Sequence, residues 1–312
     1  MTAERHDGAS ARTVLPARQR RGGDSPVAFL VRASIYPILL IAPLLLLSAL
    51  LDSGAALAWA PYAAVAIGAP ALLAAERLLP YRRDWLPSGA DLSDDALYLA
   101  LVQILLPLGL GWAAVLAAQS WLSGAGLTLS IWPGHWPIWA QLLAKITIGD
   151  FFRYWLHRAA HGWPPLWRLH AVHHAPEKLY TMNVFRFHPA EKALQFLCDS
   201  LPFILVGLGP EVLAYYFVFY AMSGLLQHAN CDLRLGWLNY LVSGPEVHRW
   251  HHSRRISESN ANYAHSFVVW DLLLGTYFRP KDAAVGELGL LNRNYPRRFW
   301  QQLAAPFRQL RP

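Results

Sequence analysis

Long runs of apolar residues dominate the first half of the chain, and short polar turns separate them. The runs cover Val27–Leu51, Ala55–Leu79, Asp95–Gln119 and Trp136–Tyr154. Each approaches the ~20 apolar residues that an α-helix needs to cross about 30 Å of hydrocarbon. Prolines lie inside several of the runs, and membrane helices tolerate them as kinks. The pattern therefore predicts four transmembrane helices.

A fifth apolar region, Ala193–Leu226, is interrupted by the turn sequence Gly207–Glu211. Each half has about 15 residues, which is short for a full crossing. Histidines flank both ends of the region, so both ends are expected on one side of the membrane. This predicts a helical hairpin that crosses and returns, or only re-enters the bilayer. Two ordinary short spans with the same sidedness are the alternative.

Polar, basic segments flank the apolar part. Residues 1–26 contain five arginines and no apolar periodicity, which predicts a disordered basic tail. Residues 281–312 are also basic and polar, with Trp300 and Phe307 as aromatic residues. They predict a cytoplasmic C-terminal tail that touches the bilayer surface. Residues 27–280 between the tails are predicted to form one membrane-embedded domain, and the fold class is an all-α, multi-pass membrane protein.

The distribution of arginine predicts the orientation in the membrane. The connection after the second span holds three arginines between positions 77 and 83. The other two connections, 52–55 and 120–135, contain no Lys or Arg. By the positive-inside rule, the N-terminus and the second connection are cytoplasmic. Four crossings then return the chain to the cytoplasm near Trp155, just before the histidines begin.

Composition agrees with a membrane protein and narrows its chemistry. Charged residues make up only 15% of the chain and hydrophobic residues 54%, whereas an average soluble domain has about 25% charged residues. The two cysteines, Cys198 and Cys231, are too few for a disulfide framework or an iron–sulfur centre. The basic segments surround membrane spans, so no nucleic-acid partner is expected. The Arg-rich and Ala-rich usage favours a bacterial inner membrane.

Histidine clusters supply the candidate chemistry, because ten of the 13 histidines fall between positions 157 and 252. Three motifs place imidazoles three or four residues apart, the spacing at which one helix points several nitrogens at one ion. The motif residues are His157, His161, His170, His173, His174, His248, His251 and His252. His188 and His228 are further candidate ligands. The set would satisfy two metal ions with about four to five ligands each.

Several other metal or nucleotide sites are excluded by the motifs they require. The chain has no His-Glu-x-x-His protease helix and no Gly-rich nucleotide loop. It also lacks the Glu-x-x-His motif of ferritin-like carboxylate sites. His265 and His135 lie outside the three motifs and are not expected to bind metal.

A metal-bound histidine usually donates its second N–H to an acceptor. Asp150 lies two helical turns before His157 and is a candidate for this role. Asn230 and Asn262 are candidates as well, and Glu191 and Asp232 share the same interpretation. For each of them, a purely structural role is the alternative.

With these motifs, the chain resembles the fatty acid hydroxylase/sterol desaturase superfamily of membrane di-iron oxygenases. The resemblance spans roughly residues 90–280, and the stretches that carry it are 150–161, 166–174, 187–191, 227–230, 248–252 and 262–277. Ala264 departs from the pattern, because the family usually has Gly after Asn-Tyr. The departure bears on a turn and not on metal binding.

The resemblance implies a helical membrane core topped by a cytoplasmic, histidine-rich cap that holds two iron ions. Zinc could replace iron in purified material, because affinity alone does not select between them. The implied reaction uses O₂ and electrons to attack a C–H bond of a lipid from the bilayer. No heme-attachment or flavin-binding sequence is visible, so a separate donor is expected, ferredoxin-like or cytochrome b5-like with its reductase. Hydroxylation and desaturation remain alternatives, and the lipid is not specified.

A membrane metal transporter or metal sensor is the alternative from a different class. A transport path needs polar or ionisable residues within the spans. The first three spans contain little of this kind besides Arg32 and Gln103. The pattern therefore disfavours transport.

Overall fold

The computed structural model describes residues 25–125, 131–280 and 283–308, and within these ranges it is helical without β-strands. The longer helices are α1 (Pro26–Asp52), α2 (Ala60–Leu78), α3 (Gly89–Leu97), α4 (Leu106–Ala125), α5 (Ile138–Gly162), α6 (Pro164–His174), α7 (Pro189–Asp199) and α9 (Pro210–His228). The short helices are α8 (Leu201–Leu205), α10 (Pro245–His251), α11 (Ile256–Ser259), α12 (Val269–Leu273) and α13 (Phe299–Ala304). A π-helical stretch, η2 (Tyr98–Leu105), joins α3 to α4, and η1 (Arg83–Trp85), η3 (Thr181–Phe185), η4 (Gly236–Tyr240) and η5 (Ala305–Phe307) are 3₁₀ turns. The predicted all-α class is confirmed.

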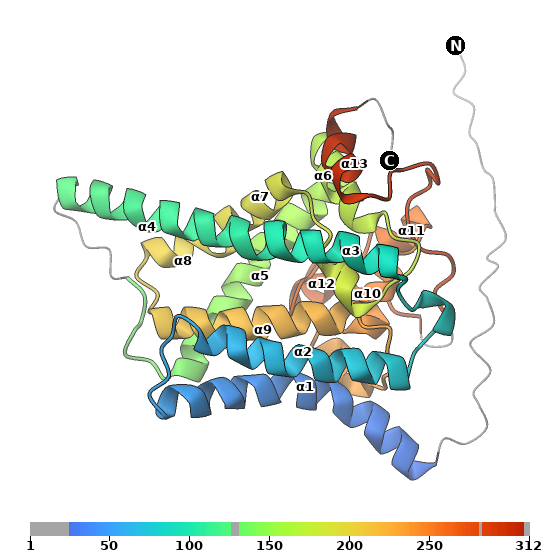
Figure 1. The fold of residues 1–312 in the computed structure, drawn as a ribbon, viewed down its shortest axis with the longest axis horizontal. Coiled ribbons are helices and arrows are strands. Elements are labelled where there is room, and N and C mark those ends of the chain that lie inside the picture. Colours follow the sequence, from blue (N-terminus) through green and yellow to red (C-terminus); the bar gives the residue numbers. More distant parts are fainter. Residues whose placement is uncertain (1–24, 126–130, 281–282, 309–312) are drawn as a thin grey trace.

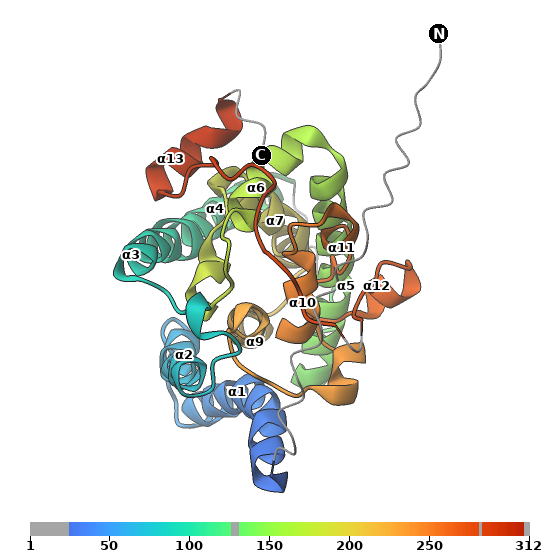
Figure 2. The same ribbon diagram turned by 90° about the vertical axis from the view of Figure 1, so that its right-hand side faces the viewer.

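The long helices form the body of the molecule, and the short helices other than α8 gather toward one end of it (Figure 1). Helices α1, α2 and α9 pack against one another, and the continuous helix α3–η2–α4 passes over the opposite side. Seen from the short-helix end, α9 lies between the α1–α2 pair and the histidine-bearing segments (Figure 2). The α1–α2 turn and the end of α4 lie at the far end, away from α10 and α11.

Two stretches of the described chain are long and apolar enough to cross a membrane, Pro26–Asp52 and Gly89–Ala114. In α1 only Tyr36, Pro43 and Leu47 are buried, so most of its apolar side chains face outward. An outward apolar surface is what a lipid environment requires. These stretches correspond to the first and third predicted spans.

The second and fourth predicted spans also form helices, α2 and α5. Helix α5 differs from a simple span because its inner face buries Lys145, Asp150 and Arg153. It also continues beyond the predicted end at Tyr154 to Gly162, which carries the first histidines into the short-helix end. The number of helices that cross the membrane remains a prediction.

The predicted hairpin over residues 193–226 is built from α7, α8 and α9. Its turn contains Gly207, whose φ of 84° lies in the left-handed region that glycine adopts without strain. Helix α9 returns through the protein, where Met222 and Leu226 join the core shared with α1 and α2. Whether the hairpin spans the bilayer or re-enters it stays open.

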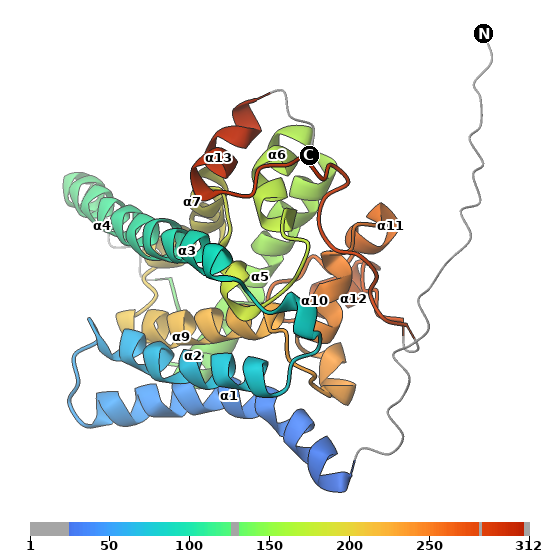
Figure 3. The same ribbon diagram turned by 45° about the vertical axis from the view of Figure 1, so that its right-hand side comes forward.

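The segment expected to be a C-terminal tail is instead packed into the fold over residues 283–308. Leu288 lies in a buried cluster with Trp85 and Trp250, and Phe299 packs edge-on against Tyr98 at a ring distance of 4.6 Å. Helix α13 lies beside α3, at the start of the continuous helix α3–η2–α4, and near α6 (Figure 3). Apolar residues of this segment such as Leu288 and Phe299 are therefore part of the core. Trp300 and Phe307, the aromatic residues expected to touch the bilayer, are exposed.

Gly68 lies at a close approach of α1, α2 and α9, and replacing it with Ala is expected to destabilise the protein. A Cβ there would lie 2.7 Å from Pro43 Cγ and 3.2 Å from Met222 Cε. Overpacking of this kind costs about 1–3 kcal/mol. Gly68→Ala should therefore lower the thermal unfolding midpoint of the purified protein in detergent.

Gly109→Ala is the matched control, because Gly109 is an exposed helical glycine and nothing lies within 4 Å of the added Cβ. Its midpoint should stay the same or rise. Equal midpoints for the two variants would show that the three helices are not in close contact at Gly68.

Candidate metal centre

Three helices and the end of a fourth deliver the histidines to the short-helix end of the molecule. Helix α5 contributes a pair one turn apart in its last two turns, and α6 starts at a Pro-Pro sequence directly after it. The third contribution comes from the last residue of α9, and the fourth from α10 and the residue after it. The nine histidines are His157, His161, His170, His173, His174, His228, His248, His251 and His252.

The nine histidines form two neighbouring groups whose ligand atoms lie within 4.8 Å of one another inside each group. The first group is His157, His161, His170, His174 and His251, and the second is His173, His228, His248 and His252. The first group therefore takes His170 and His174 from α6, and the second takes His173. In the same way, His251 joins the first group, whereas His248 and His252 join the second. Residues four apart share a helix face, whereas the third histidine of each motif is rotated toward the other group.

The nitrogen spacings fit a shared ion in each group. In the first group, His174 Nε2 lies 3.1 Å from both His170 Nε2 and His251 Nε2, and His157 Nε2 lies 3.0 Å from His170 Nε2. In the second, His248 Nε2 lies 3.1 Å from His228 Nε2 and 2.9 Å from His252 Nε2. Two nitrogens bound to one ion at about 2.0–2.1 Å are separated by roughly 2.9–3.4 Å.

In six of the rings, Nδ1 faces a hydrogen-bond acceptor, and Nε2 is left to face the centre of the group. Side-chain oxygens contact three of them: Asn260 with His161 at 3.0 Å, Glu191 with His170 at 2.8 Å and Asn183 with His228 at 2.8 Å. Backbone carbonyls of Tyr263, Arg186 and Ala261 face Nδ1 of His157, His173 and His251. An acceptor at the second ring nitrogen fixes the tautomer and orientation of a metal-binding histidine.

Burial keeps these imidazoles in the neutral form that binds metal. Seven of the nine side chains are buried, and His157 and His161 are half-buried. Desolvation lowers the pKa of His173 to about 3 and moves the pKa of His251 and His252 well below 6.5. The Nε2 atom of His161 is buried without a hydrogen-bond partner. Neutral nitrogens, among them this unpartnered Nε2, suit a divalent transition metal.

His188, predicted as a possible further ligand, does not join either group. Its Nδ1 accepts a hydrogen bond from the Ala190 N–H at 3.1 Å, and its Nε2 faces the Leu303 carbonyl at 3.2 Å. It is the N-cap of α7, directly before Pro189, so both ring nitrogens already have structural partners. His135 and His265 also lie outside the groups, as the sequence suggested.

Asp150 was expected to orient a histidine ring, but it holds a neighbouring loop instead. Its carboxylate accepts hydrogen bonds from the backbone N–H groups of Ser266 and Phe267 at 3.1 and 2.8 Å. Asp150 is buried, and the hydrogen bonds of its carboxylate go to the loop after α11 and to no histidine ring of the described structure.

Asn230 and Asn262 likewise contact backbone and not a histidine ring. Asn230 exchanges hydrogen bonds with both backbone groups of Arg82. Asn262, at a φ of 57°, donates to the carbonyls of Val247 and Phe278, and this holds α10 against the following loop. Asp232 pairs with Arg32 and Arg234. Of the five candidates, Glu191 alone contacts a ring of the two groups in the described structure.

The acceptors Asn183 and Asn260 were missed in the sequence. Neither belongs to a histidine motif, and Asn183 is 45 residues from its partner His228. Asn260 lies two residues before the Asn262-Tyr263 pair, and that proximity was the only signal. The three carbonyl acceptors carry no side-chain signal at all.

A cavity of about 630 Å³ opens beside the two groups. His157 and His170 of the first group line it, as do His173 and His248 of the second. Most of the remaining lining is apolar, and α2, η2, η3, α7 and α9 contribute to it. The groups therefore lie at the wall of a cavity large enough for part of a lipid.

A helical protein with two adjoining all-histidine sites beside an apolar cavity defines a class of histidine-rich, metal-binding membrane-type enzymes. The sequence profile described as "Fatty acid hydroxylase" matches residues 142–276, which contain all nine histidines. The chain belongs to this family, and the resemblance stated above is confirmed. No solved structure matches the chain.

Three of the relatives are named as a hydroxylase, a monooxygenase and a decarbonylase. Ornithine lipid hydroxylase OlsE of Rhizobium tropici is 34% identical over 238 residues, which cover 74% of this chain and 71% of the relative. Alkylglycerol monooxygenase of Xenopus tropicalis is 28% identical over 152 residues, which cover 48% of this chain and 32% of that protein. A very-long-chain aldehyde decarbonylase of Oryza sativa subsp. japonica is 29% identical over 154 residues, 48% of this chain and 58% of the relative.

Removing one ligand should change the metal content of the purified protein. We expect two metal ions per chain in the wild type and at most one in His251→Ala, because His251 Nε2 lies at the centre of the first group. His188→Ala should keep two, since its ring belongs to neither group. Elemental analysis by inductively coupled plasma mass spectrometry measures both. Two ions in His251→Ala would contradict the assignment of the first group.

Proposed function

We propose that this chain is an O₂-dependent di-iron monooxygenase that hydroxylates a C–H bond of a lipid taken from the bilayer. The observation that carries the proposal is the pair of neighbouring all-histidine groups at the wall of a largely apolar cavity. Iron held by nitrogen ligands with open positions would supply O₂ activation and the oxidising power to attack an unactivated C–H bond.

The residues of the chain contribute orientation and exclusion of water. The six acceptors behind the rings hold the imidazoles in one tautomer, with Nε2 turned toward the centre of each group. Side chains such as Leu99, Ile104 and Phe217 make the cavity wall apolar and exclude bulk water from the reacting carbon. Phe187 stacks on His173 at a ring distance of 4.1 Å and keeps that ligand packed against the cavity.

The names of the relatives favour hydroxylation over desaturation, since two of them are a hydroxylase and a monooxygenase. Electrons are proposed to come from a separate ferredoxin-like or cytochrome b5-like protein, because the chain has no heme-attachment or flavin-binding sequence. The proposed location is a bacterial inner membrane, with the two groups at the cytoplasmic side.

Isotope labelling tests the proposed reaction. In a host strain that lacks lipid hydroxylases, expression under ¹⁸O₂ should add one labelled oxygen atom to a membrane lipid, as seen by mass spectrometry. His173→Ala should abolish the product, because it removes a ligand from the second group. His135→Ala is the matched control and should retain activity, since its ring lies against Trp136 and outside both groups.

Four outcomes would contradict the proposal. Product that forms under strict anaerobiosis would contradict the di-iron oxygenase assignment. So would product formed by His173→Ala at near wild-type level. Loss of two hydrogens without gain of oxygen would identify desaturation. Metal-dependent growth effects without any lipid product would favour the metal transport or sensing alternative.

Cysteine labelling tests the proposed orientation of the chain in the membrane. In a variant without Cys198 and Cys231, single cysteines are placed at Ser53, in the α1–α2 turn, and at Ser257, in α11; both positions are exposed. A membrane-impermeant maleimide added to intact cells should label Ser53→Cys and spare Ser257→Cys. Disrupting the membrane should make both reactive. Labelling of Ser257→Cys alone in intact cells would reverse the proposed orientation.

A further inference from the structure

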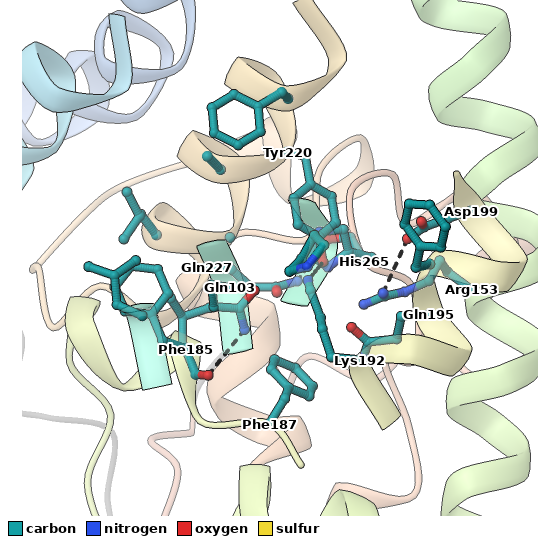
Figure 4. Close-up of a pocket in the computed structure, with 18 of the residues that line it drawn as sticks. Gln103, Arg153, Phe185, Phe187, Lys192, Gln195, Asp199, Tyr220, Gln227 and His265 are labelled. Carbon is teal, nitrogen blue, oxygen red and sulfur yellow. Dashed lines mark hydrogen bonds and ion pairs between the residues drawn. The ribbon is translucent and has the colours of Figure 1, made fainter. Parts of the chain in front are cut away.

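One stretch of the cavity wall gathers several polar and charged side chains. Figure 4 shows Arg153, Lys192, Gln195, Tyr220 and His265 gathered in this stretch, from α5, α7, α9 and the loop after α11. None of these residues belongs to the two histidine groups. We call these five residues the polar cluster.

Lys192 gives the polar cluster its positive charge. Its side chain is buried, with the residue 7% exposed, and its Nζ donates a hydrogen bond to the Tyr220 hydroxyl at 3.0 Å. Arg153, by contrast, is neutralised by Asp199 at 3.2 Å. No direct ion pair joins Lys192 to a carboxylate of the described residues, and Oε1 of the preceding Glu191 is engaged with His170 and Gln195 instead. A buried ammonium without a directly paired anion is costly, which points to an anionic group supplied by a ligand.

Two further atoms of the polar cluster are buried without a hydrogen-bond partner in the described structure. They are Nε2 of His265 and Oε1 of Gln195, and both residues line the cavity. His265 is held against the Tyr220 ring, with the ring centres 4.5 Å apart. Buried polar atoms of a native protein almost always have a partner, so these atoms also indicate a polar ligand. The ring nitrogen of His265 can donate to an anionic oxygen, whereas the Gln195 amide oxygen can only accept from a hydroxyl or N–H of the ligand.

The polar cluster adjoins the first histidine group. Gln195 donates to Glu191 at 3.0 Å, and Glu191 in turn contacts His170 Nδ1 at 2.8 Å. His265 follows Tyr263, whose carbonyl faces His157 Nδ1 at 2.7 Å. Away from the cluster, the wall is formed by the side chains of Tyr62, Val65, Ala66, Ala69, Leu73, Leu99 and Ile104. The cavity is therefore amphipathic, with its polar stretch next to the metal ligands.

We propose that Lys192, together with Tyr220 and His265, binds an anionic oxygen group of an amphipathic lipid, either a carboxylate or a phosphate. The acyl chain then occupies the apolar part of the cavity between α2 and η2. Calling this lipid the substrate rests on the proposed function. Because the anion is held beside the histidines, the oxidised carbon lies in the head group or in the first few carbons of the chain, not at the distal methyl end.

The test measures binding without iron, O₂ or reductant. Full-length protein in nanodiscs of phosphatidylcholine is loaded with tritiated hexadecanol, which is displaced by unlabelled hexadecanol, hexadecanoate or hexadecyl phosphate. At least one anion should compete about tenfold better than hexadecanol, and the better one identifies carboxylate or phosphate. Lys192→Met should remove this preference while hexadecanol still binds, and Lys192→Arg should keep most of it.

Lys178→Met is the matched control, because Lys178 pairs with Asp91 and does not line this cavity. It should keep the wild-type preference. The inference is overturned if neither anion outcompetes hexadecanol on the wild type, or if Lys192→Met retains the preference. Should Lys192→Met lose hexadecanol binding altogether, Lys192→Gln is measured in its place and read by the same criteria. A failed oxygenase assay would leave this result standing, since the binding assay needs no turnover.

Discussion

The close approach of nine imidazoles is the constraint on which the rest of the structure depends. Within each group, Nε2 atoms face one another at about 3 Å, a spacing that neutral, buried nitrogens adopt around a shared cation. Desolvation disfavours protonation of the rings, so repulsion between imidazolium groups does not break the groups apart. Four separate segments must therefore end at one place, and the packing of α5, α6, α9 and α10 brings them there.

The polar residues around the histidine groups form two layers, one in contact with the rings and one outside it. Glu191, Asn183 and three backbone carbonyls contact the rings directly. A further layer holds the loop that carries the Tyr263 carbonyl, because Asp271 accepts hydrogen bonds from the N–H groups of Tyr263 and Ala264. Asp150 holds the same loop two residues further on. Precise ring orientation thus depends on backbone segments whose positions are fixed by buried carboxylates.

The helices packed around the histidine-bearing segments form the apolar outer surface of the molecule. Helix α1 turns most of its apolar side chains outward, while α9 behind it is largely buried. Between α2, η2 and α9, the cavity extends from apolar helix surfaces to the histidines. A lipid chain can therefore remain in apolar surroundings while its polar end approaches the metal ligands and Lys192.

The sequence by itself determined the helical class, the apolar segments and nine of the ligand candidates. Apolar run length and the spacing of histidines along a helix are local properties, readable without tertiary contacts. The division of each His-x-x-His-His motif between two groups, the exclusion of His188 and the roles of Asn183, Asn260 and Asp150 were decided only by the tertiary structure. So was the packing of residues 283–308, expected as a tail. Contacts such as Asn183 with His228 join residues far apart in sequence, and their geometry follows from how the helices pack, which no local pattern encodes.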